Sequence, residues 1–103
     1  MINRGVEKIS PREIDEVLLA HPAIAEAVAF GAPHKTWGEE VAAAVKLKEG
    51  ATAIEAEILA FCRERLADFK RPKQIFITEA IPRTATGKIQ RRVVAQAFST
   101  QAS

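Results

Sequence analysis

The 103-residue sequence is poor in cysteine, histidine and aromatic residues, and each shortage excludes a class of structure or site. Its single cysteine, Cys62, excludes an internal disulfide and fits a reducing compartment, so we expect a cytoplasmic protein. The two histidines, His21 and His34, stand apart from any second ligand, and we expect no bound metal. No apolar run approaches the ~18 residues of a membrane span, and the N-terminus lacks a signal-peptide pattern.

Charge is unevenly distributed along the chain. Residues 1–62 hold 6 Lys/Arg and 10 Asp/Glu (net −4), whereas residues 63–103 hold 9 and 3 (net +6). A basic half can bind nucleic acid. Here, however, Pro72, Pro82 and apolar residues interrupt the basic positions, and no aromatic platform is interleaved with them. The pattern therefore favours a small polyanionic ligand, and we expect no nucleic-acid partner.

Length and periodicity predict one α+β domain with a thin core. The expected architecture is a small three-stranded sheet packed with helices, plus an N-terminal β-hairpin. The expected elements are a hairpin over 2–9, helices over 11–21, 52–67 and 88–98, and strands over 23–30, 40–48 and 74–78. The expected core faces are Ile24, Val28 and Phe30 in the first strand and Ile89, Val93 and Ala97 in the last helix.

Polar residues at the starts of two helices predict how those helices are capped. Ser10 with Glu13, and Thr52 with Glu55, have the spacing of capping boxes. Asp15 follows in the first turns of the first helix, where we expect a solvated acidic face that the helix dipole favours.

Residues 82–92, P-R-T-A-T-G-K-I-Q-R-R, place a lysine between a Thr/Gly turn and an apolar-periodic helix. Gly87 can adopt positive φ, and Lys88 is expected near the positive end of a helix, which suits phosphate or carboxylate. The segment is not a P-loop, because that motif needs glycine at position 82 and Ser or Thr at 89, where this chain has Pro82 and Ile89. Taken alone, a Gly-Lys segment in a surface loop is usually a solvated turn.

Three segments together resemble the C-terminal signatures of the acyl-CoA synthetase and adenylation-domain superfamily of AMP-forming enzymes. They are residues 82–92, residues 2–11 (I-N-R-G-V-E-K-I-S-P), similar to the loop that opens that family's small C-terminal domain, and residues 69–73 (F-K-R-P-K), similar to the segment before its last strand. The resemblance implies that residues 1–103 form the C-terminal lid domain of an acyl-CoA synthetase. It also implies that the large ATP- and acid-binding domain is absent from this chain.

The family's two half-reactions assign the first role to Lys88. Members form an acyl-adenylate and pyrophosphate from a carboxylic acid and ATP, then pass the acyl group to a thiol, usually that of coenzyme A. By resemblance, Lys88 is the catalytic cation that bridges carboxylate and nucleotide while negative charge builds between them. ATP and coenzyme A are implied as substrates, with Mg²⁺ accompanying ATP but not bound by this domain. The implied partners are the N-terminal domain of the same enzyme, the acyl-adenylate and coenzyme A.

In the second half-reaction, the resemblance implies that the domain rotates about a hinge and presents its opposite face. The residues implied to bind coenzyme A are Gly5, Glu7, Trp37, Phe69, Arg71 and Lys73. Gly5 would let the backbone approach the pantetheine arm, although family members often have two glycines where this chain has Gly5 and Val6. Glu7 would join that loop's polar network, or be a plain solvated glutamate.

The remaining members of this set would contact other parts of coenzyme A. Trp37 would wall the pantetheine, or instead plug the edge of the core. Phe69 would face the adenine, while Arg71 and Lys73 would bind phosphates or form a basic surface patch.

The wording of the motifs most resembles ligases for fatty, aryl or small dicarboxylic acids, including oxalate–CoA ligases. We therefore expect an acid–thiol ligase of fatty-acid or related metabolism, with the isolated domain inactive. Two alternatives stay open: a lid domain that loads a carrier protein, and a non-catalytic module that binds coenzyme A or nucleotides. Residues 69–73 favour coenzyme A, because a carrier protein lacks the adenine nucleotide.

Overall fold

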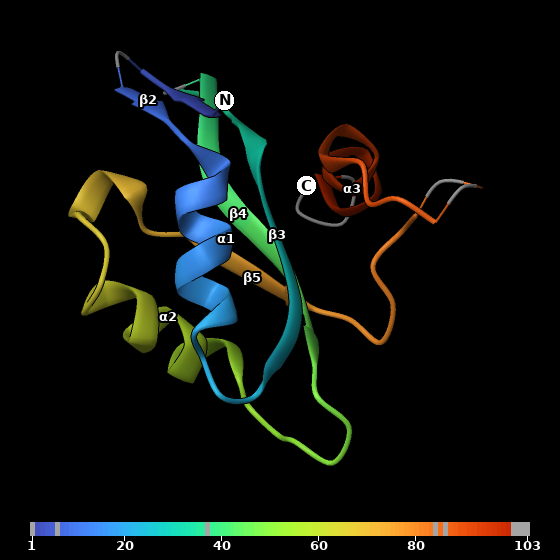
Figure 1. Ribbon diagram of the computed structural model, residues 1–103. Coiled ribbons are helices and arrows are strands. Elements are labelled where there is room, and N and C mark those ends of the chain that lie inside the picture. The colour runs from blue at the N-terminus through green and yellow to red at the C-terminus, as the bar shows by residue number, and fades with distance from the viewer. Residues whose placement is uncertain (1, 6, 37, 84, 86, 100–103) are drawn as a thin grey trace.

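A computed structural model, drawn in Figure 1, describes residues 2–5, 7–36, 38–83, 85 and 87–99. Its elements in chain order are β1 (Ile2–Arg4), β2 (Glu7–Ile9), α1 (Pro11–Leu19), β3 (Ile24–His34), β4 (Gly38–Leu47), α2 (Glu55–Arg63), the short 3-10 helix η1 (Asp68–Lys70), β5 (Gln74–Ile77) and α3 (Arg91–Ser99).

Strand β4 is the centre of the sheet. β3 runs antiparallel to it, from the pair Ile24↔Leu47 to the pair His34↔Gly38. β5 runs parallel to it over residues 74–77. β1 pairs antiparallel with β2, and Arg4 of β1 meets Gly38 at the start of β4. The predicted three-stranded sheet and N-terminal hairpin are therefore confirmed, with the hairpin joined to the sheet.

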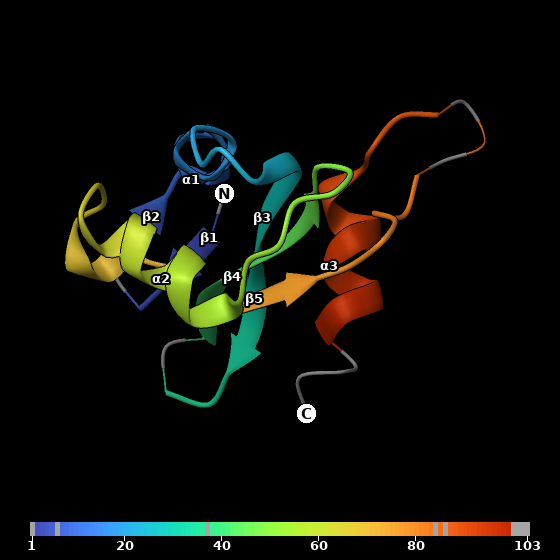
Figure 2. The same cartoon turned by 90° about the horizontal axis from the view of Figure 1, so that it is seen from below.

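Helices cover both faces of this sheet (Figure 2). α1 and α2 lie on one face, where they contribute the buried residues Ile14, Leu18, Ile58 and Cys62 to one core cluster. α3 lies on the other face and contributes Val94 and Phe98 to a second cluster. Because both faces are covered, residues 41–45 of β4 (V-A-A-A-V) are buried throughout, as expected for a central strand.

The position of α3 is fixed by stacked phenylalanines. The ring centroid of Phe98 lies 5.3 Å from that of Phe76 on β5 and 6.5 Å from that of Phe30 on β3. Such offset aromatic pairs stabilise packing beyond the area they bury. The last helix is thereby attached to both β3 and β5.

Strand β3 differs from its prediction in length and in facing. It continues through residues 31–33 to His34, pairing with the first residues of β4. The register shifts between Ile24 and Glu26, so Ile24 joins the cluster under α1 and α2, whereas Val28 and Phe30 join the cluster under α3. The prediction that these three share one face is wrong, because the bulge adds one residue to the alternation.

The predicted capping boxes are also wrong. Ser10 is the N-cap of α1, but its side chain makes no capping hydrogen bond. Glu13 instead forms an ion pair with Lys70 of η1, at 3.0 Å. Glu55 accepts a hydrogen bond from the backbone N–H of Ile75, at 2.8 Å. Partners from distant segments thus replace the local caps that the sequence suggests.

All three helices also differ from expectation in their boundaries. α3 begins at Arg91, three residues later than predicted, and its buried residues are Val94 and Phe98, each one position beyond the expected 93 and 97. Ile89, predicted in that helix, lies ahead of it and packs against the same cluster. α2 spans Glu55–Arg63 rather than residues 52–67, and α1 ends at Leu19 rather than at residue 21.

Candidate functional site

The Lys88 segment, defined here as residues 82–90, leads into α3 and lies on the far side of that helix from α1 and α2 (Figure 1). Gly87 has φ +84°, in the left-handed region that favours glycine, as predicted. Lys88 follows as an exposed residue, three positions before α3 begins. Lys88 therefore lies ahead of α3, whereas the sequence predicted it in the first turn of that helix.

Two arginines connect this segment to the body of the domain. Arg83 forms an ion pair with Glu26 on β3, and its Nη1 donates a hydrogen bond to the carbonyl oxygen of Gly87, at 3.2 Å. Arg91, the first residue of α3, donates to both carboxylate oxygens of Asp15 on α1, at 3.1 and 2.9 Å. Lys88 therefore lies between two arginines, each of which is paired with an acidic residue.

The sequence predicted that Asp15 belongs to a solvated face, and that prediction is wrong. Besides binding Arg91, its carboxylate accepts a hydrogen bond from the backbone N–H of Ala29 at 2.6 Å. The missed signal is its spacing on α1: residue 15 is three positions from the buried Leu18, so the two share a side of the helix.

At the other end of the domain lies the hairpin end, defined as the β1–β2 hairpin, η1 and residues 71–73. Gly5 lies in the β1–β2 turn with φ +61°, and the backbones of Arg4 and Glu7 lie opposite each other in the antiparallel register of the hairpin. Because Arg4 also meets Gly38, this turn lies at the same end as the β3–β4 connection. Trp37 belongs to that connection but falls outside the described residues.

The two predicted phosphate ligands at this end differ in their surroundings. Nε of Arg71 donates to the carbonyl oxygen of Leu66 at 3.0 Å, and Nη2 donates to that of Arg63 at 2.9 Å. Nη1 of Arg71 also pairs with Asp68 at 3.3 Å. Lys73 is exposed, and it lines with Arg71 a shallow pocket of about 210 Å³. Arg71 therefore binds carbonyls at the end of α2 in addition to facing this pocket.

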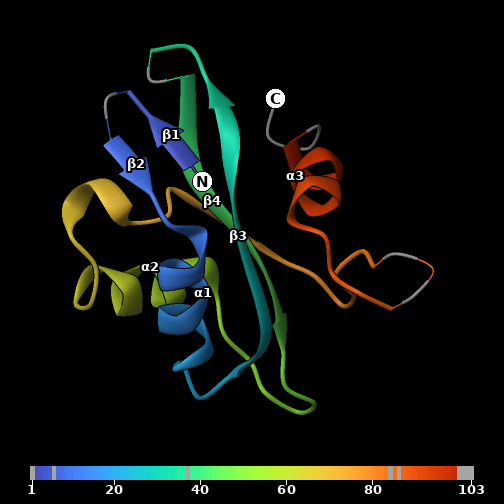
Figure 3. The same ribbon diagram turned by 45° about the horizontal axis from the view of Figure 1, so that its top comes forward.

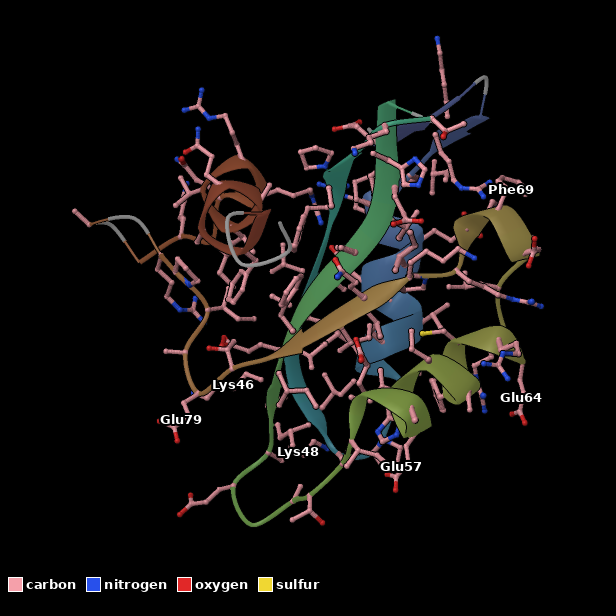
Figure 4. All side chains as sticks on the ribbon, turned by 180° about the vertical axis from the view of Figure 1, so that it is seen from behind. Lys46, Lys48, Glu57, Glu64, Phe69 and Glu79 are labelled. Atoms are coloured by element: carbon pink, nitrogen blue, oxygen red, sulfur yellow. The ribbon has the colours of Figure 1, made fainter. Side chains whose placement is uncertain are left out.

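Phe69 is partly buried against the core cluster under α1 and α2, and the ammonium of Lys70 lies 5.6 Å from its ring centroid. Figure 3 places η1 beside the hairpin, and Figure 4 shows Phe69 at that end while Glu79, on the way to the Lys88 segment, lies on the opposite side. The structure therefore brings Gly5, Phe69, Arg71 and Lys73 to one end and places Lys88 away from them.

Burial in the core raises the pKa of the Cys62 thiol from 9.0 to about 11, although the nearby Arg65 opposes the shift. A thiol with this pKa is protonated at neutral pH and has little nucleophilic character. Within the described part of the chain, no cluster of three or more His, Cys, Asp or Glu residues could hold a metal ion. Over the same residues, no helix has the length and apolar character needed to cross a membrane.

Comparison with known proteins decides the family. Residues 13–88 match the family described as AMP-binding enzyme C-terminal domain. The chain belongs to this family. The match includes residues 69–73 and ends at Lys88, whereas Gly5 and Glu7 precede it.

Relatives of this AMP-binding enzyme C-terminal domain include CoA ligases. A probable CoA ligase of Humulus lupulus is 56% identical over 103 residues, which is 100% of this chain and 20% of the relative. The oxalate–CoA ligase of Arabidopsis thaliana is 57% identical over 98 residues, 95% of this chain and 19% of the relative. The chain therefore spans about a fifth of the length of the curated relatives it matches.

The fold of the domain also matches that of solved structures. ATP-bound MatB from Rhodopseudomonas palustris superposes with a TM-score of 0.92 at 31% identity, covering 100% of this chain and 20% of that chain. Apo MatB gives a TM-score of 0.91 at 32% identity, covering 99% of this chain and 20% of that chain. The α+β fold expected from the sequence is therefore the fold of the family.

Proposed function

We propose that this domain is the mobile C-terminal domain of an ATP-dependent, AMP-forming carboxylate–CoA ligase. The observation that carries the proposal is an exposed Lys88 directly after Gly87, at the end of the family match and in front of α3. The named CoA-ligase relatives support coenzyme A, and not a carrier protein, as the thiol. The proposed partner is a larger N-terminal domain that holds ATP and the acid.

Lys88 acts in the first half-reaction. Attack of a carboxylate on the α-phosphate brings two anions together, and an ammonium between them stabilises the charge that develops. The lysine is a compact point charge on a flexible stem, so it can reach both groups from an exposed position. Closure of the domain over the nucleotide excludes water and strengthens this interaction.

The hairpin end acts in the second half-reaction. The turn at Gly5 admits the pantetheine arm, since glycine has no side chain to obstruct it. Three of the five N–H donors of Arg71 already bind Leu66, Asp68 and Arg63, so two remain for a phosphate. Lys73 is therefore the main phosphate contact in this proposal. Phe69, Trp37 and Glu7 keep the supporting roles that the sequence suggested.

The acid is recognised by the larger domain. Relatives named for oxalate, 2-succinylbenzoate and 4-chlorobenzoate remain 57%, 45% and 40% identical to this chain, although those acids differ in size and charge. Such similarity supports a domain that serves many acids, of which fatty acids are one class. We place Mg²⁺ with ATP in the larger domain, and the enzyme in the cytoplasm.

The half-reactions of the complete enzyme test this proposal. Lys88→Ala should slow adenylate formation roughly 10²–10³-fold, the usual loss for one preorganised electrostatic contact. Thioester formation from a pre-made acyl-adenylate should be nearly unchanged in single-turnover assays. Lys46→Ala, at an exposed lysine on β4, is the matched control and should leave adenylation unchanged. Equal slowing of both steps by Lys88→Ala would contradict the assignment, as would ATP–pyrophosphate exchange by the isolated 103-residue chain.

A further inference from the structure

We propose that Arg83 and Arg91 hold the Lys88 segment at its two ends, and that their acidic partners, Glu26 and Asp15, are positioning residues for adenylation. This inference rests on the proposed role of Lys88 in that step. We call the four residues the arginine clamp.

The Arg91 anchor joins elements from both faces of the sheet. β3 is at the edge of the sheet, and the backbone of Ala29 faces outward there. Its N–H donates to Asp15 on α1 at 2.6 Å, and its carbonyl accepts from Arg91 on α3 at 2.6 Å. Asp15 and Arg91 also bind each other, so the pair bridges the edge of β3 and fixes α1, β3 and α3 together.

Burial makes this anchor strong. The side chain of Asp15 is 17% exposed and that of Arg91 is 34% exposed. A bidentate, charge-assisted contact of this kind stabilises the structure more than an exposed surface ion pair does. Lys88 is three residues from Arg91, so its Cα lies within about 11 Å of that anchor by chain length alone. Fixing the start of α3 therefore restricts where Lys88 can be.

The Arg83 anchor fixes the other end of the segment. Arg83 pairs with Glu26, which lies on the same strand as Ala29, three residues earlier. The same guanidinium binds the carbonyl of Gly87, next to Lys88, at 3.2 Å. The two side chains of this anchor are more exposed than those of the Arg91 anchor, at 43% for Arg83 and 25% for Glu26. We therefore expect a smaller contribution from this anchor.

Each anchor includes a residue of β3: Glu26 binds Arg83, and the carbonyl of Ala29 binds Arg91. One strand therefore holds both ends of the segment in position. A lysine is a more effective catalytic cation when the backbone that carries it is already in position, because ordering a loose segment in each cycle costs conformational entropy. The clamp fixes the backbone on either side of Lys88. Neither anchor contacts the hairpin end among the interactions described for these four residues, so its loss should affect adenylation and not thioester formation.

The test uses Asp15→Asn and Glu26→Gln in the complete enzyme. Each change removes a charge and keeps the side-chain shape. Asp15→Asn should slow adenylation by about 10- to 100-fold, within the cost of a small misplacement of a reacting group, and Glu26→Gln by a few-fold. Thioester formation from the pre-made adenylate should stay within about two-fold of the parent. Glu13→Gln is the matched control, because Glu13 is also on α1 and pairs with Lys70 at 3.0 Å at the hairpin end; it should leave adenylation unchanged.

A second readout separates positioning from general destabilisation. Hydrogen exchange of the complete enzyme should be faster over residues 85–90 in Asp15→Asn and Glu26→Gln, with little change in β4. Faster exchange across the whole domain, or equal slowing of both half-reactions, would overturn the positioning role. If Asp15→Asn does not fold, Glu26→Gln at the more exposed anchor still decides the question.

Lys88→Ala, measured in parallel, distinguishes failure of the clamp from failure of the proposed function. If Lys88→Ala slows adenylation while Asp15→Asn and Glu26→Gln do not, the clamp is overturned and the function stands. If Lys88→Ala has no effect on adenylation, the function fails and the positioning role fails with it.

Discussion

The Lys88 segment and the β1–β2 hairpin are held in place by different forces. Side-chain ion pairs attach the first to β3 and α1, through Arg83 and Arg91. Backbone pairing holds the hairpin, where residues 2–4 pair with residues 7–9 and Arg4 meets Gly38. The difference suits the proposed tasks. A lysine with a long side chain needs only its Cα held in position, whereas a ligand that approaches the backbone closely needs that backbone to be rigid.

The largest effect expected at the hairpin end comes from Gly5→Val. Gly5 has φ +61°, and a β-branched residue is strained there. The substitution should distort the turn and slow thioester formation about 100-fold, the cost of misplacing a reacting group by about 1 Å. Adenylation should be nearly unchanged, the reverse of the pattern expected for Lys88→Ala. Single-turnover rates of the two half-reactions in the complete enzyme measure this split.

Gly50→Val is the matched control for backbone strain. Gly50 also has positive φ, +77°, and a Cβ there would meet no atom within 4 Å. It lies between β4 and α2, outside the Lys88 segment and outside the residues proposed to bind coenzyme A. Both half-reactions should survive the change. If Gly50→Val slows the thiol step as much as Gly5→Val, strain alone explains the result and the hairpin has no special role.

A smaller effect should divide Arg71 from Lys73. Lys73→Ala should raise the apparent KM for coenzyme A by about ten-fold, the loss of one charge-assisted contact, with the melting temperature unchanged. Arg71→Ala should in addition lower the free energy of unfolding by about 1–2 kcal/mol, because it removes hydrogen bonds to the carbonyls of Leu66 and Arg63. Steady-state kinetics of the complete enzyme and urea unfolding of the 103-residue chain measure the two effects. A Lys73→Ala enzyme with unchanged KM would contradict phosphate binding at this end.

The sequence predicts local features of this domain well. Alternation and turn residues place the strands, and the apolar run over 41–45 belongs to the strand that the structure puts at the centre. The positive φ at Gly87 follows from its place in a turn before a helix. These features depend on neighbours within a few residues, which periodicity and propensity describe.

Long-range polar pairs could not be predicted in the same way. Asp15 and Arg91 are 76 residues apart, and Glu13 and Lys70 are 57 apart, so no local pattern indicates that they meet. Local rules instead suggested a capping box for Glu13 and solvent for Asp15. The bulge in β3 is also invisible in the sequence, and it reversed the expected facing of one residue. The errors therefore concentrate in the contacts that join the layers and hold the Lys88 segment.

The smallest effect concerns Cys62, in the core cluster under α1 and α2. Folding raises the pKa of Cys62 from 9.0 to about 11, so the folded state keeps a proton that the unfolded state releases above pH 9. The sign follows from linkage: where the unfolded state binds fewer protons, stability falls as pH rises. The contribution of this thiol is fully present below pH 9 and declines toward pH 11, by about 1 kcal/mol at pH 10.

Urea unfolding of the 103-residue chain between pH 7 and 10.5 measures this decline. Cys62→Ala should be less stable at every pH because a buried side chain is lost, but its stability should fall less steeply above pH 9 than that of the parent. The parent and the variant differ at residue 62 alone, so the difference between their slopes reports Cys62. Identical slopes would mean that the thiol ionises equally in both states. A steeper fall in the parent would show that alkaline pH weakens the core cluster under α1 and α2 through one buried proton.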